Sequence, residues 1–301
     1  MEIIKPGTNF DFVGKIKITT GISIALIIIS ILSVVMHKGL NLGIEFAGGT
    51  IIQIKFSQTA GADDIRKTFM DINISDAIIQ EIGKDEVIVR TNHPADKEFQ
   101  TIVDEAMVKQ FGEGNFEIRK IEFVGPKVGA DLRNKAVLAI ILSCLGMLIY
   151  IAFRFEFRYG LGGVIALIHD TIVTIGALSL LNKEFTLAVV AALLTIIGYS
   201  INDTIVVFDR IRENRRKDLR KKLADVINSS INETLSRTIL TSLTVVLVLV
   251  ALFFLGGPVI HDFSFALLVG VIVGTYSSIF IASPIVLFFE SSKLSRGKGK
   301  K

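Results

Sequence analysis

Three apolar stretches of this chain contain side chains that ionise or form strong hydrogen bonds. They are the pair His169–Asp170, the pair Asn202–Asp203, and Arg237. A charged side chain inside a membrane span costs on the order of 2.5–3.5 kcal/mol on insertion scales, so each of these residues needs a local explanation. An acid and an arginine on neighbouring helices can neutralise each other, and a histidine exchanges protons near neutral pH. The five residues are therefore our candidate proton-coupling residues.

Purely structural roles are open for two of them. Arg237 lies about a turn inside its apolar run, so its long side chain can also snorkel to the membrane surface. Asp203 lies about 9 Å from the midpoint of its run, at ~1.5 Å per residue, and can instead be a buried hydrogen-bond acceptor. Asp170 lies mid-run, where a proton relay fits better. Asp209 and Arg210 are expected to be ordinary residues of the membrane interface.

The elements that must position these side chains are six apolar runs. Each is long enough to cross a hydrocarbon core of roughly 30 Å, which takes about 20 helical residues. Half of the 301 residues are hydrophobic, and the charged residues, 21% of the total, are kept out of these runs. The predicted spans are residues 18–36, 136–153, 160–181, 186–208, 235–255 and 264–289.

Two features predict how the last span packs. Gly270 and Gly274 form a G-x-x-x-G pattern, which permits a close helix contact. Pro284 is expected to kink the same helix near its end.

The basic residues predict the orientation of the spans. Segments 1–17, 154–159, 209–234 and 290–301 carry 18 lysines and arginines, whereas the two short loops on the opposite side carry one, Lys183. Both termini are therefore predicted to be cytoplasmic. The first run has no A-x-A cleavage pattern after it, so we expect a retained span rather than a cleaved signal peptide.

The basic run 210–222 lies directly after the fourth apolar run. We expect it to lie against anionic lipid. No aromatic interleaving or nucleic-acid motif accompanies it, so nucleic acid is not an expected partner. The single cysteine, Cys144, allows no disulfide within the chain.

The segment 37–135 is polar, and we predict that it forms a folded domain inserted between the first two spans. Alternation of apolar and polar residues predicts strands, and an apolar face at helical spacing predicts helices. Residues 83–85 predict a tight hairpin, and His93 is expected to be a surface residue. The predicted order is strand 50–57, helix 62–72, strands 77–82 and 86–90, helix 96–111 and strand 116–123. This βαββαβ order is that of a ferredoxin-like α+β domain.

We find no nucleophile–base pair, metal-ligand spacing or nucleotide-binding loop, so an enzyme is not expected. One span, an outer domain and five further spans resemble half of an RND-superfamily transporter. Within that superfamily the chain resembles the SecD/SecF family of protein-export membrane proteins, and particularly its SecF branch, over essentially its whole length. The resemblance is carried by residues 43–50 (GIEFAGGT), His169–Asp170, residues 202–214 (NDTIVVFDRIREN) and residues 235–238 (LSRT).

The glycine block is shared with SecD proteins, and a structural role is implied for it. Its motif residues are Gly43, Glu45, Phe46, Gly48 and Gly49. The family more often has aspartate where this chain has Glu45, and the difference keeps the negative charge.

The resemblance implies a membrane all-α six-helix half-RND bundle with an inserted periplasmic α+β domain. It implies a multi-pass protein of the bacterial cytoplasmic membrane that pairs with SecD, works with the SecYEG channel and YajC, and acts on exported preproteins. Asp203 and Arg237 would carry the coupling, with the proton as coupling ion and no other cofactor. Two other functions fit the spans: an RND-type efflux half-transporter for small molecules or lipids, and a non-transporting scaffold of the translocon.

Overall fold

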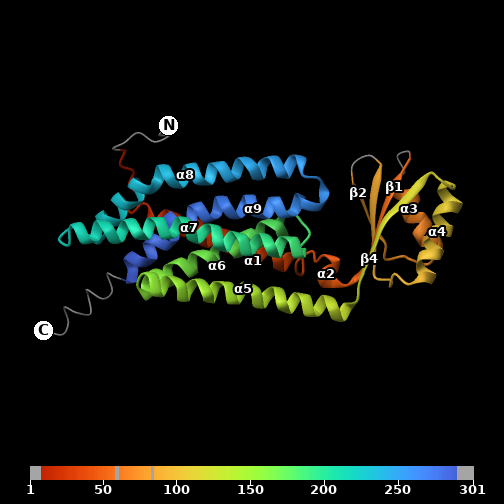
Figure 1. Ribbon diagram of the computed structural model, residues 1–301, viewed down its shortest axis with the longest axis horizontal. Coiled ribbons are helices and arrows are strands. Elements are labelled where there is room, and N and C mark those ends of the chain that lie inside the picture. Colours follow the sequence, from red (N-terminus) through yellow and green to blue (C-terminus); the bar gives the residue numbers. More distant parts are fainter. Residues whose placement is uncertain (1–7, 58–60, 83–84, 290–301) are drawn as a thin grey trace. The chain divides into compact units, whose positions relative to one another are not determined.

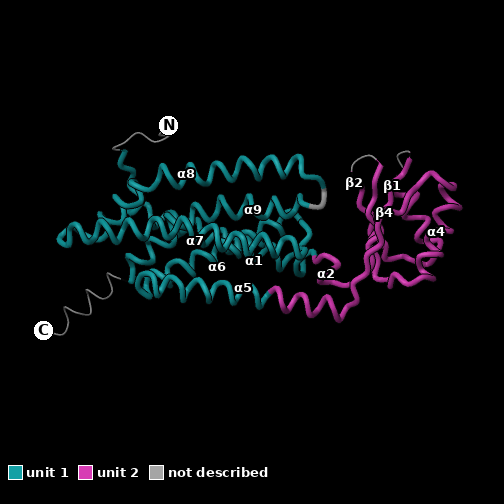
Figure 2. Tube along the Cα trace, viewed as in Figure 1, with its two compact units in different colours: residues 1–41, 137–301 teal, residues 42–136 magenta. Residues whose placement is uncertain are grey.

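The computed structural model describes residues 8–57, 61–82 and 85–289 (Figure 1). Two compact units are present: residues 1–41 with 137–301 form unit 1, and residues 42–136 form unit 2 (Figure 2). Gly83 and Lys84, which belong to the predicted hairpin, lie outside the described residues.

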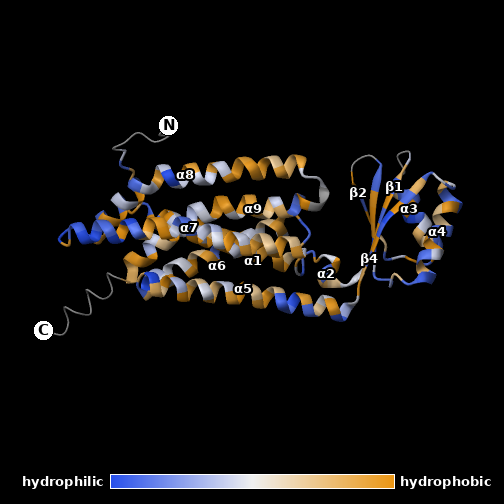
Figure 3. Cartoon of the chain, viewed as in Figure 1, coloured by the Kyte–Doolittle hydropathy of each residue, from blue (hydrophilic) through white to orange (hydrophobic). Residues whose placement is uncertain are grey.

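Unit 1 is a bundle of long apolar helices. Six helices are long and apolar enough to span a membrane, and their apolar character is visible along the bundle in Figure 3. The chain is a multi-pass membrane protein. Its helices are α1 (Ile16–Met36), α5 (Pro126–Arg154), α6 (Phe157–Leu180), α7 (Leu187–Lys217), α8 (Leu223–Leu255) and α9 (Pro258–Ser277), and α9 continues through a π-helical turn, η1 (Ser278–Ala282).

The helices of unit 1 differ in how deeply they are buried. Half or more of the apolar windows of α6, α7 and the last helix is buried, whereas α1, α5 and α8 expose most of theirs. The central helices therefore hold the interior of the bundle, and the outer three present apolar side chains to lipid or to a partner.

Three helices extend beyond the apolar runs. α5 begins at Pro126, α7 continues to Lys217 and α8 begins at Leu223. Ion pairs at helical spacing support the polar end of α7, since Glu213 pairs with Arg210 and with Lys217 at 2.7 Å each. Hydropathy predicts which residues lie in hydrocarbon, but a helix can continue into residues of low hydropathy. The helices are therefore longer than the predicted spans.

The N-terminal stretch is held on the polar end of α8. The backbone N–H of Phe10 donates to the Asn232 side chain, and that of Phe12 donates to the Asn228 side chain, both at 2.8 Å. These two asparagines are one helical turn apart, so they fix the approach of the chain to α1.

The sequence predicts a kink near Pro284, and the structure has a π turn just before this residue. Proline lacks an N–H and its ring crowds the carbonyl four residues earlier. The turn Ser278–Ala282 precedes it, and the Ser283 hydroxyl donates to the Ser278 carbonyl at 3.1 Å. π turns of this kind are frequent at functional sites.

Unit 2 is a four-stranded antiparallel sheet with the short helix α2 and the two longer helices α3 and α4. The sheet order is β2-β3-β1-β4, and the β1 residues Ile52, Ile54 and Phe56 are buried in its core. This order and the βαββαβ sequence confirm the ferredoxin-like prediction. The elements are α2 (Ile44–Ala47), β1 (Gly49–Phe56), α3 (Ala62–Asp71), β2 (Ile78–Ile82), β3 (Glu86–Thr91), α4 (Lys97–Phe111) and β4 (Phe116–Val124).

Asp76 ties the start of β2 to the end of β3. Its carboxylate accepts hydrogen bonds from the Thr91 hydroxyl at 3.0 Å and from the Asn92 N–H at 2.7 Å, and the His93 ring lies 3.8 Å away. Partial burial raises the pKa of Asp76, but these hydrogen bonds and the nearby His93 outweigh it, so the pKa lies below its ordinary value.

We predict a pH-dependent contribution of Asp76 to the stability of unit 2. Because the folded pKa is lowered, the contribution is complete above the unfolded pKa of ~3.9 and is lost as the pH falls through the lower folded value. Hydrogen exchange of the full chain, followed at residues 91–93, should be slower in wild type than in Asp76→Asn at about pH 6, and the difference should shrink towards about pH 3. A difference that is the same at both pH values would contradict this linkage.

Candidate functional site

Asp170 on α6 is the centre of a buried polar cluster. Its side chain is fully buried, and its Oδ2 accepts hydrogen bonds at 2.7 Å from Ser200 on α7 and at 2.7 Å from Ser277 on α9. Its Oδ1 lies 3.1 Å from Nδ1 of His169, which donates to it when the carboxyl is ionised. One carboxylate therefore joins the three central helices.

The cluster continues along α7 and into the π turn. The hydroxyls of Thr204 and Ser278 hydrogen-bond at 2.9 Å. The close approach depends on Gly274, because a Cβ there would lie 2.9 Å from the Cβ of Ser200 and 3.5 Å from Oδ2 of Asp170. The G-x-x-x-G pattern thus brings α9 close enough to α7 for short hydroxyl side chains to bridge the two helices.

Asp203 belongs to a second, neighbouring polar group. It is 4% exposed, and its Oδ2 accepts a hydrogen bond of 3.4 Å from Ser242 on α8. The Ser242 hydroxyl also hydrogen-bonds to Thr275 on α9 at 2.7 Å. Asp203 follows Ser200 by about one turn of α7. Asp203 and the Ser200 hydroxyl that binds Asp170 therefore lie on the same side of this helix.

Arg237 and Asn202 are not hydrogen-bonded to these groups, although the charge of Arg237 lies close enough to Asp203 to interact with it electrostatically. Both are exposed on the surface of unit 1, and neither side chain has a hydrogen bond or ion pair among residues 8–57, 61–82 and 85–289. In particular, the structure does not bring Arg237 into contact with Asp203. The neighbouring residue on α8, Thr238, is buried instead, so the rotation of α8 turns Arg237 outwards.

Six hydroxyl side chains of the site were not among our sequence candidates: Ser200, Thr204, Ser242, Thr275, Ser277 and Ser278. Serine and threonine are common in apolar helices, so their residue type alone gives no signal. Only Ser277 and Ser278 could have been noticed in the sequence, because they lie between the G-x-x-x-G pattern and Pro284.

The glycine block lies in unit 2 and builds the turn into β1. Gly48 and Gly49 have φ of +79° and +124°, and a Cβ on Gly49 would lie 2.7 Å from the Thr91 carbonyl oxygen. Phe46 is buried, Gly43 precedes the short helix α2, and Glu45 in α2 is partly exposed. Only glycine adopts this backbone without strain, which accounts for the pair.

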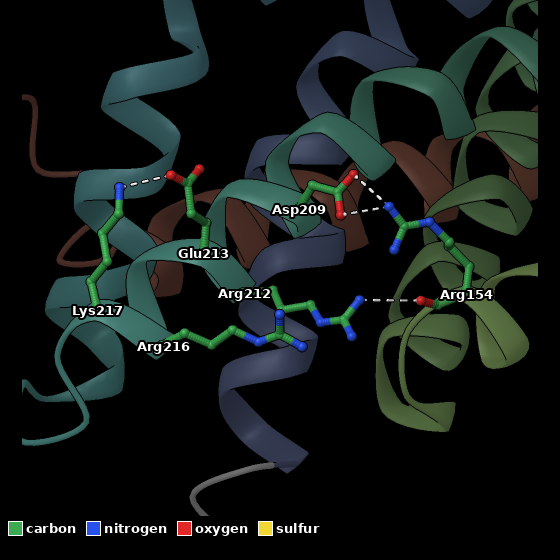
Figure 4. A pocket seen from close by; sticks show the side chains of 6 residues that line it. All are labelled: Arg154, Asp209, Arg212, Glu213, Arg216 and Lys217. Carbon is green, nitrogen blue, oxygen red and sulfur yellow. Dashed lines mark hydrogen bonds and ion pairs between the residues drawn. The ribbon is translucent and has the colours of Figure 1, made fainter.

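A basic cavity of about 520 Å³ lies at the polar end of α7 (Figure 4). Arg154 forms an ion pair with Asp209 at 3.2 Å, and Arg212 donates to the Arg154 carbonyl at 3.4 Å. The Arg216 guanidinium lines the cavity, and within the described part of the chain it has no hydrogen bond or ion pair. The cavity therefore carries positive charge that its own acidic residues do not neutralise.

A six-helix bundle with carboxylates buried between its central helices, and a ferredoxin-like domain inserted after the first helix, defines half of an RND-type membrane protein. The model of the protein-export membrane protein SecD/SecF C-terminal region matches residues 103–292, and that of the SecD/SecF GG motif matches residues 34–60.

Similar proteins agree with this class over almost the whole chain. The chain is 48% identical over 296 residues to the protein translocase subunit SecF of Magnetococcus marinus, covering 96% of this chain and 95% of the relative. It is 46% identical over 297 residues to that of Calditerrivibrio nitroreducens, covering 97% of each. The chain therefore belongs to the SecF family of protein translocase subunits. The names of these relatives denote transport rather than catalysis.

Two solved structures share the fold. The crystal structure of SecDF from Thermus thermophilus, described as a translocon-associated membrane protein, matches with a TM-score of 0.85 and 36% identity over 95% of this chain. A SecDF structure in the super-membrane-facing form matches with a TM-score of 0.74 and 35% identity over 100% of this chain. This chain spans 39% and 41% of those chains. The likeness supports a partnership with SecD.

Proposed function

We propose that this chain acts with a SecD partner to promote late-stage export of preproteins across the bacterial cytoplasmic membrane, driven by the proton gradient. The observation that carries the proposal is the pair of buried carboxylates, Asp170 and Asp203, each hydrogen-bonded to hydroxyls of neighbouring helices. The proton is the proposed coupling ion, and no other cofactor is proposed.

The coupling follows from the change in charge. An ionised carboxylate accepts stronger hydrogen bonds than a neutral carboxyl, so protonation loosens the bonds that join α6, α7, α8 and α9. Each proton that crosses the membrane releases about 2.3 kcal/mol per 100 mV of potential. A few protons therefore supply enough free energy to repack the helices, and we propose that this repacking moves unit 2 on the outer side.

The proposed SecD contact is the face of unit 1 that carries Arg237 and Asn202. A charged side chain facing hydrocarbon is costly, and a partner helix would remove that cost. The exposed residues of α7 near Asn202 are small, including Thr195 and Gly198, which lets a second helix approach closely. Pairing of Arg237 with an acid is then proposed to occur in the assembled unit or in another conformation.

Further partners and the location rest on the family resemblance and on charge. We propose contact with the SecYEG channel and YajC. The excess of basic residues on one side, 18 against Lys183 alone, supports cytoplasmic termini in the inner membrane.

Export of a model preprotein into inverted membrane vesicles tests the proposal. The vesicles contain the chain and its SecD partner, and preprotein export is measured with and without a proton gradient. Asp203→Asn is expected to remove the gradient-dependent part of export. The matched control is Asp209→Asn, a carboxylate on the same helix that is paired with Arg154 and is not buried, which should retain it.

Two rival functions predict different results in the same vesicles. A scaffold needs no titratable group in the membrane, so export would be unchanged in Asp203→Asn while the SecD complex stays intact. An RND-type efflux half-transporter would instead show gradient-dependent movement of a lipophilic dye that Asp203→Asn abolishes, with no effect on preprotein export.

The basic cavity is our proposed contact with anionic lipid. A phosphate headgroup would meet the unpaired Arg216 guanidinium beside Arg212. Each basic residue near an anionic surface contributes about 1 kcal/mol, which is roughly a fivefold change in binding.

Lipid retention tests that contact. Arg216→Gln is expected to retain roughly fivefold less phosphatidylglycerol than wild type in native mass spectrometry. Arg220→Gln removes an exposed basic residue of the same run outside the cavity, so it is the control and should lose clearly less lipid than Arg216→Gln. Equal loss in both variants would show a diffuse charge effect rather than a site.

A further inference from the structure

The first turn of α5 packs directly against the glycine block of unit 2. α5 begins at Pro126, and its residues up to Ala136 belong to unit 2 together with the block. A Cβ on Gly48 would lie 3.0 Å from the Cα atom of Pro126. A Cβ on Gly129 would lie 3.0 Å from the carbonyl oxygen of Phe46. Glycines therefore line both sides of the contact, which lets the two backbones approach each other closely.

This contact has little room to change. A Cβ on Gly129 would also lie 3.2 Å from the carbonyl carbon of Phe46 and 3.3 Å from the nitrogen of Gly48, and backbone atoms cannot turn away as a side chain can. Pro126 occupies the first position of α5, where its fixed φ suits a helix start. Phe46 is 3% exposed, so it holds the short helix α2 in place. The glycine block and the start of α5 therefore form one rigid element of unit 2.

α5 continues into unit 1 without a break, but it is loosely packed there. The helix runs from Pro126 to Arg154, and the boundary between the two units falls after Ala136. Only 6% of its apolar window is buried, the smallest share among the six spans of the described chain. Its buried residue Ile151 packs against Leu167 of α6. A helix with so little buried surface can shift against its neighbours at low cost.

The other connection between the two units is built differently. Lys38 and Gly39 follow α1 with φ of +58° and +128°, so the chain turns and the helix does not continue. The carbonyl of Asn41 accepts a hydrogen bond from the N–H of Phe185 at 2.7 Å, and its side chain donates to the carbonyl of Asn182 at 3.1 Å. The N-terminal part of unit 1 ends at Asn41. α1 is therefore fastened to unit 1 and joined to unit 2 by a non-helical link, whereas α5 belongs to both units.

We propose that the glycine block and Gly129 form the joint through which movement passes between unit 2 and the helix bundle, with α5 as the connecting helix. Unit 2 and the start of α5 then move as one body, and α5 shifts against the bundle. This gives the glycine block a mechanical role and identifies Gly129, which lies outside the block, as its partner. The proposal rests on the proposed function in one respect, because proton-driven repacking of the bundle is the source of the movement.

Substitution of Gly129 tests the joint. Gly146 of the same helix is the matched control, since a Cβ there would meet no atom within 4 Å among the described residues. Export is measured in inverted vesicles, and proton flow through the SecD complex is followed with a pH-sensitive dye in proteoliposomes. Gly129→Val is expected to lose gradient-driven export and to retain proton flow, whereas Gly146→Val should retain both. Asp203→Asn, in contrast, should lose both.

Hydrogen exchange of the full chain in nanodiscs separates opening of the joint from damage to unit 2. The amides of residues 46–48 are hydrogen-bonded within α2, beside Gly129. Gly129→Val should speed exchange at these amides and leave strands β1 and β3 protected, and Gly146→Val should change neither. If Gly129→Val unfolds unit 2, the milder Gly129→Ala replaces it and is compared with Gly146→Ala.

Three results would overturn the proposal: export in Gly129→Val equal to that in Gly146→Val, loss of proton flow together with export, or unchanged exchange at residues 46–48. A wild type without gradient-driven export would contradict the proposed function instead. The exchange measurement would still decide whether Gly129 and the glycine block form a joint, because it does not depend on export.

Discussion

Replacing Asp170 by alanine is expected to destabilise the helix bundle by roughly 3–5 kcal/mol, the cost of breaking a buried, hydrogen-bonded ionic group. The substitution removes the acceptor shared by Ser200 and Ser277 and the partner of His169. Each buried donor left without an acceptor costs about 1–3 kcal/mol. Thermal unfolding of the full chain in nanodiscs, followed by the loss of folded protein, measures the effect.

Asp170→Asn is the companion variant. The amide keeps the shape of the side chain and one acceptor oxygen, so we expect a clearly smaller loss of stability than with alanine. Asp225→Ala, in the exposed first turn of α8, controls for the removal of a carboxylate from this chain. If Asp170→Ala were as stable as Asp225→Ala, the polar cluster would not be what joins the three central helices.

Replacing Arg237 by methionine is expected to have a large effect on export and almost none on the isolated chain. The guanidinium is exposed and acts on Asp203 through charge, without a hydrogen bond or ion pair in the described part of the chain, so the free energy of unfolding should change by less than about 0.5 kcal/mol. Gradient-driven export should fall by roughly tenfold or more, equivalent to at least ~1.4 kcal/mol in the driving step. Inverted vesicles and thermal unfolding of the same preparation measure the two quantities.

The combination of results separates the roles of Arg237. Arg220→Met removes an exposed basic residue from the polar end and should change neither quantity. A variant Arg237→Met that exports normally would leave snorkelling to the membrane surface as its role. Loss of stability in the isolated chain would mean that Arg237 turns inwards and that the outward orientation is a minor state.

The domain in unit 2 could be predicted almost entirely from its sequence. Its strands are buried on one face only, so β1 alternates apolar and polar residues, and the turn residues separate the elements. The spans were also evident, because hydropathy over about 20 residues is a strong signal. The helical ends of α5, α7 and α8 were not, because ion pairs and tertiary contacts, rather than hydropathy, extend those helices.

The site was only partly predictable for a similar physical reason. Ionisable residues are rare in apolar runs, so Asp170, Asp203 and His169 stood out by type alone. The hydroxyls that bind them, such as Ser242, are ordinary in such runs. Whether Arg237 meets Asp203 depends on the rotation of α8, and packing against α7 and α9 sets that rotation.

The π turn of the last helix changes which side of the helix each later residue faces. Five residues, Ser278–Ala282, occupy a turn with i→i+5 bonds, which holds one residue more than an α-helical turn. Each residue of an α-helix advances by about 100°, so every position after Ala282 is out of phase by about that angle. A single helical wheel for the whole segment would therefore place either Gly274 or Val286 on the lipid-facing side. Both lie inside, since Gly274 approaches Ser200 and Val286 is buried. Two separate wheels, one on each side of the turn, are needed to assign lipid-facing and interior residues here.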